Sequence, residues 1–360
     1  MKLGIVGLPN TGKSTLFNAI MQTGAESANY PFSTISPNVG MVPVPDERLN
    51  VLAEMYNPKV ITPATLEMVD IAGLVQGASK GEGMGNQFLS FIREVDALVH
   101  VLRSFEDEEV PFVYDEIDPL RDIETINFEL VIADLDLVER RIERTGKSKK
   151  NEKLYPREQE ALKILQEALT DSICARDIEW ENPDDAKYAK SLNLLTDKPM
   201  LYALNVPEDQ MTEESNPHIA KLKEAVGEKV FVVCAKIEEE ISRLDQEEKG
   251  MFLEELGLSQ GGTQRLIAAG YGLLGLISFL TAGPKEVRAW TIREGLRAPQ
   301  AAGKIHSDLE RGFIRAEVVA FDDLERLGTY NKAKESGLVR VEGKDYVVKD
   351  GDVMLIRFNV

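Results

Sequence analysis

The chain has 360 residues and a formal net charge of −19, and 43% of its residues are apolar. This composition is typical of a globular protein with a substantial core, and the length predicts two or three domains. No apolar run approaches the ~20 residues that span a bilayer. The chain starts on an expected strand, so we expect no signal peptide and no membrane partner. The acidic balance argues against indiscriminate nucleic-acid binding, although a local basic patch remains compatible with it. Cys174 and Cys234 are the only cysteines and lie far apart, which predicts a reduced, cytoplasmic protein.

The first motif follows an apolar strand expected at residues 1–6. Residues 7–14 read GLPNTGKS, which matches the P-loop pattern, and a helix is expected to follow. Backbone N–H groups of such a loop surround phosphate oxygens, and the helix N-terminus adds partial positive charge. We expect Lys13 to reach the β- and γ-phosphates and Ser14 to ligate Mg²⁺. A plain glycine turn is the alternative, but loop, lysine, hydroxyl and flanking elements all agree with a P-loop. The nucleotide-binding candidates here are Asn10, Thr11, Gly12, Lys13, Ser14 and Thr15.

A second motif, Asp70-Ile71-Ala72-Gly73, ends a strand expected at residues 64–69. In P-loop enzymes an aspartate at this place holds Mg²⁺, often through water, and the glycine amide senses the γ-phosphate. Upstream, residues 29–35 occupy the place of a first switch loop, where Thr34, or alternatively Ser33, is expected to ligate the metal. The catalytic candidates are Lys13, Thr34, Asp70 and Gly73. The metal-ligating candidates are Ser14, Thr34 and Asp70.

Leu74 stands where Ras-type GTPases place a water-orienting glutamine. A leucine has no polar atom with which to position water, so catalysis recruits another group or is slow. Residues 77–85 contain four glycines in nine positions, which predicts a nucleotide-sensitive second switch. A passive flexible loop is the alternative.

The base-reading segment follows a strand expected at residues 199–204. Asn205-Val206-Pro207-Glu208 stands where GTPases carry Asn-Lys-x-Asp. Glu208 is one methylene longer than the aspartate that pairs with guanine, whereas Asn205 or nearby backbone can pair with the amino group of adenine. An unpaired buried polar group costs ~1–3 kcal/mol, so we expect ATP to bind more tightly than GTP. A chance surface turn is the alternative.

The next expected strand, at residues 230–234, leads into Cys234-Ala235-Lys236. This segment resembles the Ser-Ala-Lys loop of GTPases and is expected to pack over the base. The nucleotide-binding candidates in this half of the site are Asn205, Val206, Glu208 and Ala235.

Between the nucleotide motifs the pattern becomes helical. Apolar residues step by three and four over residues 123–137 and 162–173, which predicts an antiparallel helical hairpin. Its tip is basic and could contact RNA phosphate, or be only a solvated helix end. The basic residues are Arg140, Arg141, Arg144, Lys147, Lys149, Lys150 and Lys153.

The C-terminal part alternates short β patterns with one helix. We expect a connecting helix over Leu273–Thr281, then strands near residues 287–291, 314–319 and 353–358, and a helix around residues 301–309. One helix crossing a small mixed sheet is a β-grasp fold. Lys349-Asp350-Gly351-Asp352 predicts a hairpin turn. Nothing here has a catalytic pattern, so this part is expected to bind RNA or protein.

These segments together resemble the YchF family, the Obg-like ATPases of the Obg branch of P-loop proteins. The matching residues are Gly7–Ser14, Asn29–Phe32, Thr34, Asp70–Leu74, Asn205 with Glu208, and Asp118-Pro119 with Asp122-Ile123-Glu124. The resemblance covers the whole chain, and its C-terminal segment is similar to a TGS domain.

The resemblance implies an α/β fold in three domains. These are a P-loop NTPase (Ras-like) domain with a mostly parallel sheet at residues 1–118 and 198–281, an inserted helical (coiled-coil) domain at 119–197, and a β-grasp TGS domain at 282–360. It also implies an Mg²⁺-dependent ATPase switch, slow in hydrolysis, that associates with the ribosome. The basic tip and the TGS domain would contact the large ribosomal subunit and its rRNA. The alternatives are a GTPase of the Obg type and a nucleotide-gated binding protein for which hydrolysis is incidental.

Four further residues bear on the catalytic group. Many family members have a histidine where this chain has Phe112, so a mechanism based on that histidine does not apply unless His100 substitutes. His100 lies in an apolar strand expected at 97–102 and is predicted to be a structural histidine with satisfied hydrogen bonds. P-loop proteins that use K⁺ in place of an arginine finger tend to have an asparagine at the position of Asn10, which makes K⁺ a hypothesis and capping of the loop the alternative. Arg103 is another candidate charge partner.

Overall fold

The computed structural model describes residues 1–25, 34–36, 39–71, 73, 84–147, 155–255 and 260–359. Within these ranges, the side chains of residues 23–25, 34–36, 84–86, 145–147, 155–156, 246–247 and 255 are not described. The chain forms two compact units. The first comprises Met1–Gly40 and Glu67–Leu266, and the second comprises Met41–Leu66 and Ile267–Val360. Several predicted features fall outside the described residues. These are the first switch segment up to Ser33, the residue Leu74, the glycine-rich loop and most of the basic hairpin tip.

The first unit is built on a seven-stranded sheet in the order β2-β3-β5-β1-β6-β7-β8. β1 pairs in parallel with β5 and β6, β6 with β7, and β7 with β8, whereas β2 and β3 are antiparallel. This confirms the predicted mostly parallel α/β sheet. Apolar runs buried on both faces explain why these segments became central strands. The strands are β1 (Lys2–Gly7), β2 (Thr34–Ser36), β3 (Val39–Pro43), β5 (Thr65–Asp70), β6 (Ala97–Arg103), β7 (Met200–Asn205) and β8 (Val230–Val233).

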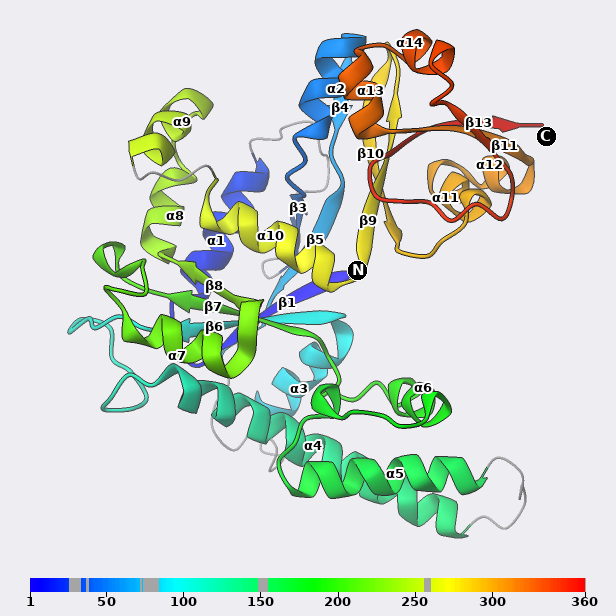
Figure 1. Ribbon diagram of the computed structural model, residues 1–360. Coiled ribbons are helices and arrows are strands. Elements are labelled where there is room, and N and C mark those ends of the chain that lie inside the picture. The colour runs from blue at the N-terminus through cyan, green and yellow to red at the C-terminus, as the bar shows by residue number, and fades with distance from the viewer. Residues whose placement is uncertain are drawn as a thin grey trace. The chain divides into compact units, whose positions relative to one another are not determined.

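Helices cover both faces of this sheet. In Figure 1, α1 (Lys13–Ala25) and α8 (Ala235–Ile241) lie on one side of β1, β6, β7 and β8, and α4 (Pro119–Lys147) and α7 (Pro217–Val226) lie on the other. The core on the second side joins apolar residues of α3, α4 and α7 to the strands. Because parallel strands end at one edge, the loops after β1, β5, β6, β7 and β8 meet there. The remaining helices of this unit are α3 (Met84–Glu94), α9 (Gln246–Glu255) and α10 (Gly262–Leu273), the last of which continues into the second unit.

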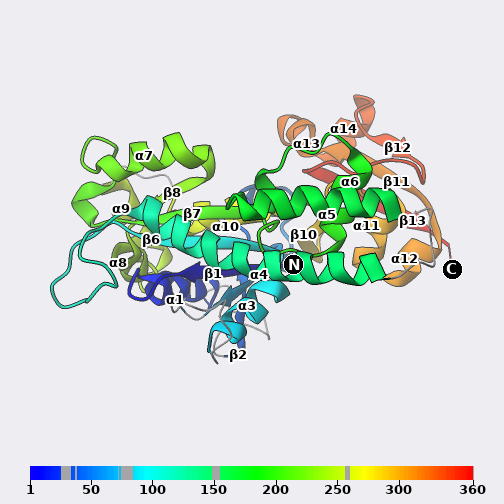
Figure 2. The same ribbon diagram turned by 90° about the horizontal axis from the view of Figure 1, so that it is seen from below.

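The predicted helical hairpin is present as α4 and α5 (Tyr155–Thr170), which lie side by side in both views (Figures 1 and 2). Its own core contains Val131, Val138, Leu162 and Leu165, with α6 (Pro183–Ser191) packed against α5. A buried carboxylate ties the hairpin to the sheet. Asp134 of α4 accepts hydrogen bonds from the backbone N–H groups of residues 195 and 196, at 3.1 and 2.7 Å, just before β7 begins.

The second unit is a six-stranded mixed sheet in the order β12-β11-β13-β9-β10-β4. α11 (Ala298–Ile305) contributes three alanines to the core beneath it, together with Phe279 and Phe313. One helix packed on a small mixed sheet agrees with the expected β-grasp arrangement. The strands are β4 (Val60–Thr62), β9 (Leu276–Ala282), β10 (Glu286–Arg293), β11 (Phe313–Ala320), β12 (Arg340–Glu342) and β13 (Asp352–Phe358). The other helices are α2 (Arg48–Tyr56), α12 (Ser307–Arg311), α13 (Phe321–Leu327) and α14 (Tyr330–Glu335).

Two local predictions were wrong in this unit. The connecting helix expected over Leu273–Thr281 is mostly β9, because Leu276–Ala282 pairs with β10 along its whole length and buries Phe279. A seven-residue apolar run fits a helix or a strand equally well until its partner is known. Lys349–Asp352 leads into β13 but joins no hairpin, since β13 pairs with β11 and β9.

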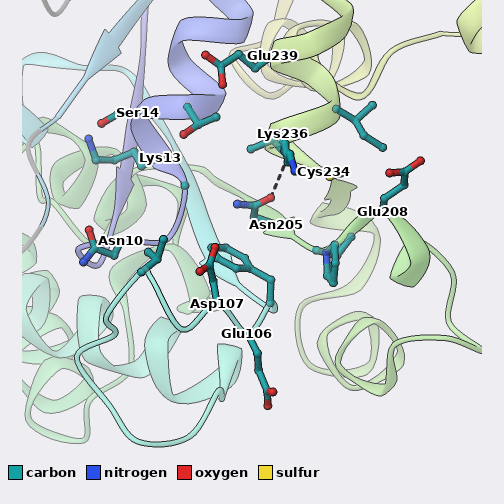
Figure 3. Close-up of a pocket in the computed structure, with 18 of the residues that line it drawn as sticks. Asn10, Lys13, Ser14, Glu106, Asp107, Asn205, Glu208, Cys234, Lys236 and Glu239 are labelled. Carbon is teal, nitrogen blue, oxygen red and sulfur yellow. Dashed lines mark hydrogen bonds between the residues drawn. The ribbon is translucent and has the colours of Figure 1, made fainter.

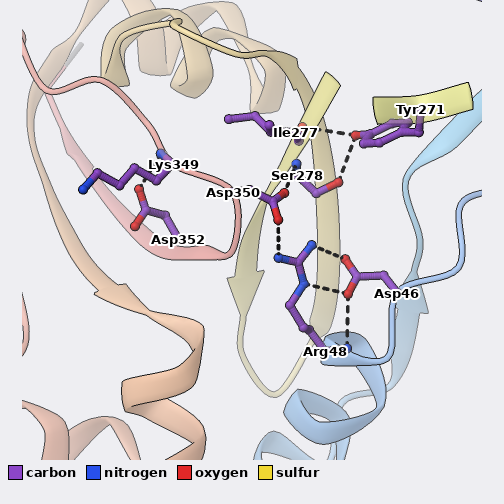
Figure 4. Close-up of polar contacts among 8 residues, drawn as sticks. All are labelled: Asp46, Arg48, Tyr271, Ile277, Ser278, Lys349, Asp350 and Asp352. Carbon is purple, nitrogen blue, oxygen red and sulfur yellow. Dashed lines mark hydrogen bonds and ion pairs between the residues drawn. The ribbon is translucent and has the colours of Figure 1, made fainter. Parts of the chain in front are cut away.

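The second unit also includes residues 41–66 and 267–281, which the sequence analysis assigned to the nucleotide-binding domain. Figure 4 shows what fastens the first of these segments. Arg48 pairs through two nitrogens with Asp46, at 2.7 and 2.8 Å, and donates to Asp350 at 2.8 Å. The other oxygen of Asp350 accepts from the backbone N–H of Ser278 in β9 at 2.8 Å. Arg48 therefore joins residues 41–66 to the C-terminal sheet.

No helix in the described ranges is both long and apolar enough to cross a membrane.

Candidate active site

A cavity of about 940 Å³ lies in the first unit, where the loops after β1, β6, β7 and β8 meet (Figure 3). Three of its walls come from segments that the sequence analysis singled out: the P-loop, the Asn205–Glu208 segment and the Cys234–Lys236 segment. A fourth wall, the loop that follows β6, was not predicted. The lining residues from the P-loop are Leu8, Pro9, Asn10, Gly12, Lys13, Ser14 and Thr15, and those from the other segments are Gly73, Phe105, Glu106, Asp107, Val110, Asn205, Val206, Pro207, Glu208, Asp209, Cys234, Ala235, Lys236, Ile237, Glu239 and Glu240.

The P-loop has the backbone shape of an anion cradle. Asn10 and Gly12 adopt positive φ angles of 61° and 86°. Two of its carbonyls are held from behind by side chains: the Thr11 hydroxyl donates to the carbonyl of Leu8 at 3.1 Å, and Asn205 donates to the carbonyl of Thr11 at 3.0 Å. In a trans peptide the N–H points opposite to the C=O, so carbonyls held by the protein leave N–H groups directed toward the cavity.

Lys13 and Ser14 open α1 at the floor of this cradle. Ser14 is exposed to the cavity, whereas Lys13 is only 9% exposed and its ammonium group forms an ion pair with Asp70. Gly73 lies against the P-loop, since a Cβ added to it would be 3.5 Å from the carbonyl oxygen of Gly7. The structure thus brings together the lysine, the strand-end aspartate and the glycine of the predicted catalytic set.

Three predicted residues stand apart from the cavity lining: Thr11, Thr34 and Asp70, whose carboxylate pairs with Lys13. Thr11 is buried, and its contribution to the site is through its backbone. The backbone of Thr34 lies in β2, but its side chain is outside the described part of the structure, so its metal-ligating role stays a prediction.

Asn205 holds two walls of the cavity together. Its Nδ2 donates to the carbonyl of Thr11, and its Oδ1 accepts from the N–H of Ala235 at 2.9 Å, the bond drawn in Figure 3. The residue is 6% exposed. From the sequence we expected Asn205 or nearby backbone to pair with the amino group of adenine. The structure commits the oxygen and one amide hydrogen of Asn205 to the protein, so bracing is its observed role and a base contact stays a prediction.

The remaining polar groups that face the cavity are mostly acceptors. Glu208 and the next residue, Asp209, lie in a short 3₁₀ helix (Glu208–Gln210). Glu106 and Asp107 come from the loop after β6, and Glu239 and Glu240 come from α8. Lys236 supplies a positive charge on the same side as Cys234, a buried thiol whose pKa is raised by desolvation.

The sequence did not predict that the loop after β6 is a wall of the cavity, although Arg103 at its start and Phe112 within it were singled out as residues that bear on the catalytic group. This arginine ends a strand whose residues are all buried, which is unusual for a charged residue without a role. The acidic composition of residues 106–109 resembles any solvated loop, so nothing marked it as a wall of the cavity.

His100 does not reach the cavity, and the expectation of satisfied hydrogen bonds was wrong. It is fully buried in β6, and neither ring nitrogen has a hydrogen-bond partner in the described part of the chain. Desolvation, together with a smaller effect of the Arg176 charge, lowers its pKa to about 3. The ring is therefore neutral and packs near Tyr202, with ring centroids 6.1 Å apart.

A structural cation site of the His, Cys or carboxylate type is not found among the described residues. The donors predicted for Mg²⁺ are of a different kind. The Ser14 hydroxyl and the Asp70 carboxylate are oxygen donors, which this hard cation prefers; Ser14 lines the cavity, and Asp70 pairs with the neighbouring Lys13.

A cradle of N–H groups between a strand and a helix, with its lysine paired to the aspartate of a neighbouring strand, is the arrangement of P-loop nucleoside triphosphate hydrolases, and this chain is one of them. Residues 2–134 match the family described as "50S ribosome-binding GTPase", and residues 276–359 match the C-terminal domain of YchF GTPases, described as "Protein of unknown function (DUF933)".

Relatives that match the whole chain identify its family more specifically than these two partial matches. The chain is 57% identical to the ribosome-binding ATPase YchF of Bacillus subtilis, with 99% of each chain covered, and 50% identical to that of Escherichia coli O157:H7, with 100% and 99% covered. It is 43% identical to Obg-like ATPase 1 of rice, covering 92% of that protein. The solved structure of the Schizosaccharomyces pombe YchF GTPase superposes with a TM-score of 0.89 at 37% identity, covering 99% of this chain and 97% of that one. The chain belongs to the YchF family, as the sequence resemblance indicated.

Proposed function

We propose that this protein is an Mg²⁺-dependent ATPase of the cytoplasm whose nucleotide state controls its association with the ribosome. The observation that carries the proposal is the cavity, in which Asn205 joins the phosphate cradle to the Cys234–Lys236 segment that is expected to pack over the base. The bacterial relatives are named ribosome-binding ATPases, whereas the yeast relative is titled a GTPase, so the base preference needs its own argument.

The hydrogen-bonding character of the cavity favours adenine. The N–H of Ala235 is used by Asn205, and the nearby Glu208 and Asp209 carboxylates only accept. The 6-position of adenine carries an amino donor, which suits acceptors. Guanine also carries N1–H and 2-amino donors, which the aspartate of GTPases accepts, but Glu208 is one methylene longer than that aspartate, and a carboxylate offers no donor to the 6-carbonyl oxygen of guanine. An unpaired buried polar group costs ~1–3 kcal/mol, which is roughly 5- to 150-fold in affinity.

Ser14 and Asp70 would hold Mg²⁺, with Thr34 as the third expected ligand. The ion, when bound, supplies positive charge to the phosphates. The chain's own groups do the rest: the P-loop N–H groups hold the phosphate oxygens, and Lys13 exchanges its Asp70 partner for a phosphate oxygen. K⁺ remains a prediction. The amide nitrogen of Asn10 donates to the carbonyl of Pro111 at 2.8 Å, so this side chain also has a structural role.

The deciding experiment is a side-by-side measurement of ATP and GTP dissociation constants with Mg²⁺ present. ATP tighter by about tenfold, ~1.4 kcal/mol, supports the ATPase. Equal or reversed affinities support the GTPase of the Obg type, the alternative that the yeast relative's title favours.

The partner is tested separately. We propose the large ribosomal subunit, with contacts to rRNA from the basic hairpin tip and from the second unit. Co-sedimentation with ribosomes in ATP, ADP and a non-hydrolysable analogue should differ between states if nucleotide controls association. The combined substitutions Lys147→Ala, Lys149→Ala and Lys150→Ala should weaken co-sedimentation. Unchanged binding of that variant would remove the tip as a docking site. Association that follows ATP but persists when hydrolysis is blocked favours the nucleotide-gated binding protein.

A further inference from the structure

A buried arginine lies directly behind the P-loop. Arg103, the last residue of β6, is 3% exposed, and its Nη1 donates to the backbone carbonyl of Asn10 at 3.2 Å. The same nitrogen donates to the carbonyl of Val110 at 3.0 Å, and Nε donates to the carbonyl of Phe105 at 3.0 Å. The guanidinium carbon lies 4.4 Å and 4.9 Å from the ring centroids of Phe105 and Phe112. One guanidinium therefore joins the P-loop to the loop that follows β6.

Within the described part of the chain, no ion pair neutralises the charge of Arg103. No carboxylate in the described ranges lies within salt-bridge distance of it, and its surroundings are carbonyl dipoles and two aromatic faces. Desolvation lowers its pKa, with Asp107 acting in the opposite direction, yet a guanidinium stays protonated at any physiological pH. An unpaired buried cation is costly, and it raises the electrostatic potential of the P-loop beside it.

The position of the donated bond matters for phosphate binding. The carbonyl of Asn10 and the N–H of Thr11 belong to one peptide group. A charged donor on the carbonyl polarises that peptide, which makes its N–H a stronger donor. Asn205 acts in the same way on the next peptide, whose N–H belongs to Gly12. Two successive N–H groups of the cradle are thus supported from behind, one by an amide and one by a cation.

We propose that Arg103 is a positioning residue for the phosphate cradle: it orients and polarises the Asn10–Thr11 peptide and ties it to the Phe105–Val110 wall of the cavity. This inference rests on the proposed function, because it concerns how the same site binds nucleotide phosphates. The bond from Asn10 to the carbonyl of Pro111 is a second tie between the P-loop and the same loop.

The test compares ligands with and without phosphates. Arg103→Met keeps an apolar stem and removes the donors, and Arg103→Lys keeps the charge with a different donor geometry. We expect Arg103→Met to weaken the binding of ATP and ADP by about tenfold or more, which is the usual value of a charge-assisted hydrogen bond. The affinity for adenosine should be unchanged. Arg103→Lys should lose less of the affinity for ATP and ADP. Isothermal titration of ATP, ADP and adenosine measures all three affinities.

A spectroscopic readout reports the polarised peptide directly. In protein labelled with ¹⁵N-threonine, the Thr11 amide proton should move upfield in Arg103→Met, as its peptide loses the donor. The matched control is Arg176→Met. Arg176 is also mostly buried in the first unit and donates to a backbone carbonyl, that of Thr196 at 3.2 Å, but it does not line the cavity. The Arg176→Met variant should change neither the affinities for ATP and ADP nor the Thr11 resonance.

Two results would overturn the inference. One is wild-type affinity for ATP and ADP in Arg103→Met, with the Thr11 resonance unmoved. The other is an equal loss for adenosine, which would mean that Arg103 only maintains the fold. If Arg103→Met does not fold, the ratio of ATP to adenosine affinity in Arg103→Lys decides in the same way. Failure of the wild-type protein to bind ATP would instead contradict the proposed function, and the two failures are therefore distinguishable.

Discussion

The side-chain nitrogen of Asn205 donates a hydrogen bond to the carbonyl of Thr11 at 3.0 Å, joining residues that are 194 positions apart. The oxygen of the same amide holds the N–H of Ala235. A single asparagine at the end of β7 therefore fixes the phosphate-binding wall of the cavity against the wall that follows β8. The shape of the cavity therefore depends on this amide as well as on the P-loop.

Replacing Asn205 should uncouple the two walls. Asn205→Ala leaves two buried backbone groups without partners, each worth ~1–3 kcal/mol, and should reduce ATP affinity by at least about tenfold. Asn205→Asp has the same shape but places an oxygen against the carbonyl of Thr11, and a similar loss is expected. Asn216→Ala is the control, since Asn216 is also buried and donates to Ser104 at 2.9 Å away from the cavity lining. Wild-type affinity in Asn205→Asp would contradict the bracing role.

Gly12 should not tolerate a side chain, for a reason beyond its backbone angle. A Cβ at Gly12 would lie 2.1 Å from Nδ2 of Asn205, which is a direct clash with the brace. Gly12→Ala should therefore abolish tight ATP binding in a titration. Gly227→Ala is the matched control: Gly227 has a positive φ of 69° but no atom within 4 Å of the added Cβ. Both variants should lose roughly 1–2 kcal/mol of stability from backbone strain, but only Gly12→Ala should lose affinity for ATP.

Asp70 should matter for turnover more than for ADP binding. Asp70→Asn keeps the shape of the carboxylate but removes the charge that pairs with Lys13 and that would hold Mg²⁺. We expect turnover of ATP to fall by about a hundredfold or more, the usual cost of losing one electrostatic group at a transition state, with ADP affinity nearly unchanged. The readouts are phosphate release at saturating ATP and the Mg²⁺ concentration for half-maximal rate. Asp46→Asn, which breaks an ion pair in the second unit, should leave turnover intact. Full activity in Asp70→Asn would remove this aspartate from the catalytic set.

His100 should make the first unit sensitive to acid. Its pKa is about 3 in the folded state and ~6.5 when unfolded, so the unfolded chain binds the additional proton between these values. The stability from neutral His100 is fully present above pH 6.5 and is lost as the pH falls toward 3, by ~2 kcal/mol at pH 5.

The apolar variant His100→Leu removes both this titration and the unpartnered nitrogens. It should be at least as stable as wild type at pH 8 and should lose less stability between pH 8 and pH 5. Hydrogen exchange of the β6 and β7 amides measures the effect locally. His306→Gln, at an exposed position, should retain the wild-type pH dependence. An identical pH dependence in His100→Leu would show that other groups cause the acid sensitivity.

Much of the fold class could be predicted because its signals are local. The P-loop spacing, the apolar runs of the central strands and the three-four stepping of the hairpin each lie within a few consecutive residues. The wrong predictions came from segments whose state depends on a distant partner. β9 became a strand because β10 pairs with it, and residues 41–66 joined the second unit because β4 pairs with β10 and Arg48 meets Asp350. The sequence showed that His100 lies in an apolar strand, but not that both of its ring nitrogens lack hydrogen-bond partners among the described residues.

The sequence by itself determined which class of chemistry this chain carries, since glycines, a lysine and a hydroxyl at fixed spacing fold into a phosphate cradle through short-range backbone geometry. Only the tertiary structure decided how that cradle is held. Arg103 and Asn205 reach the carbonyls of Asn10 and Thr11 because parallel strands end at one edge of the sheet, which brings together residues that are about one hundred and two hundred positions apart in the chain. No local pattern encodes such a contact, because its energy comes from hydrogen bonds that form only after the strands have packed side by side.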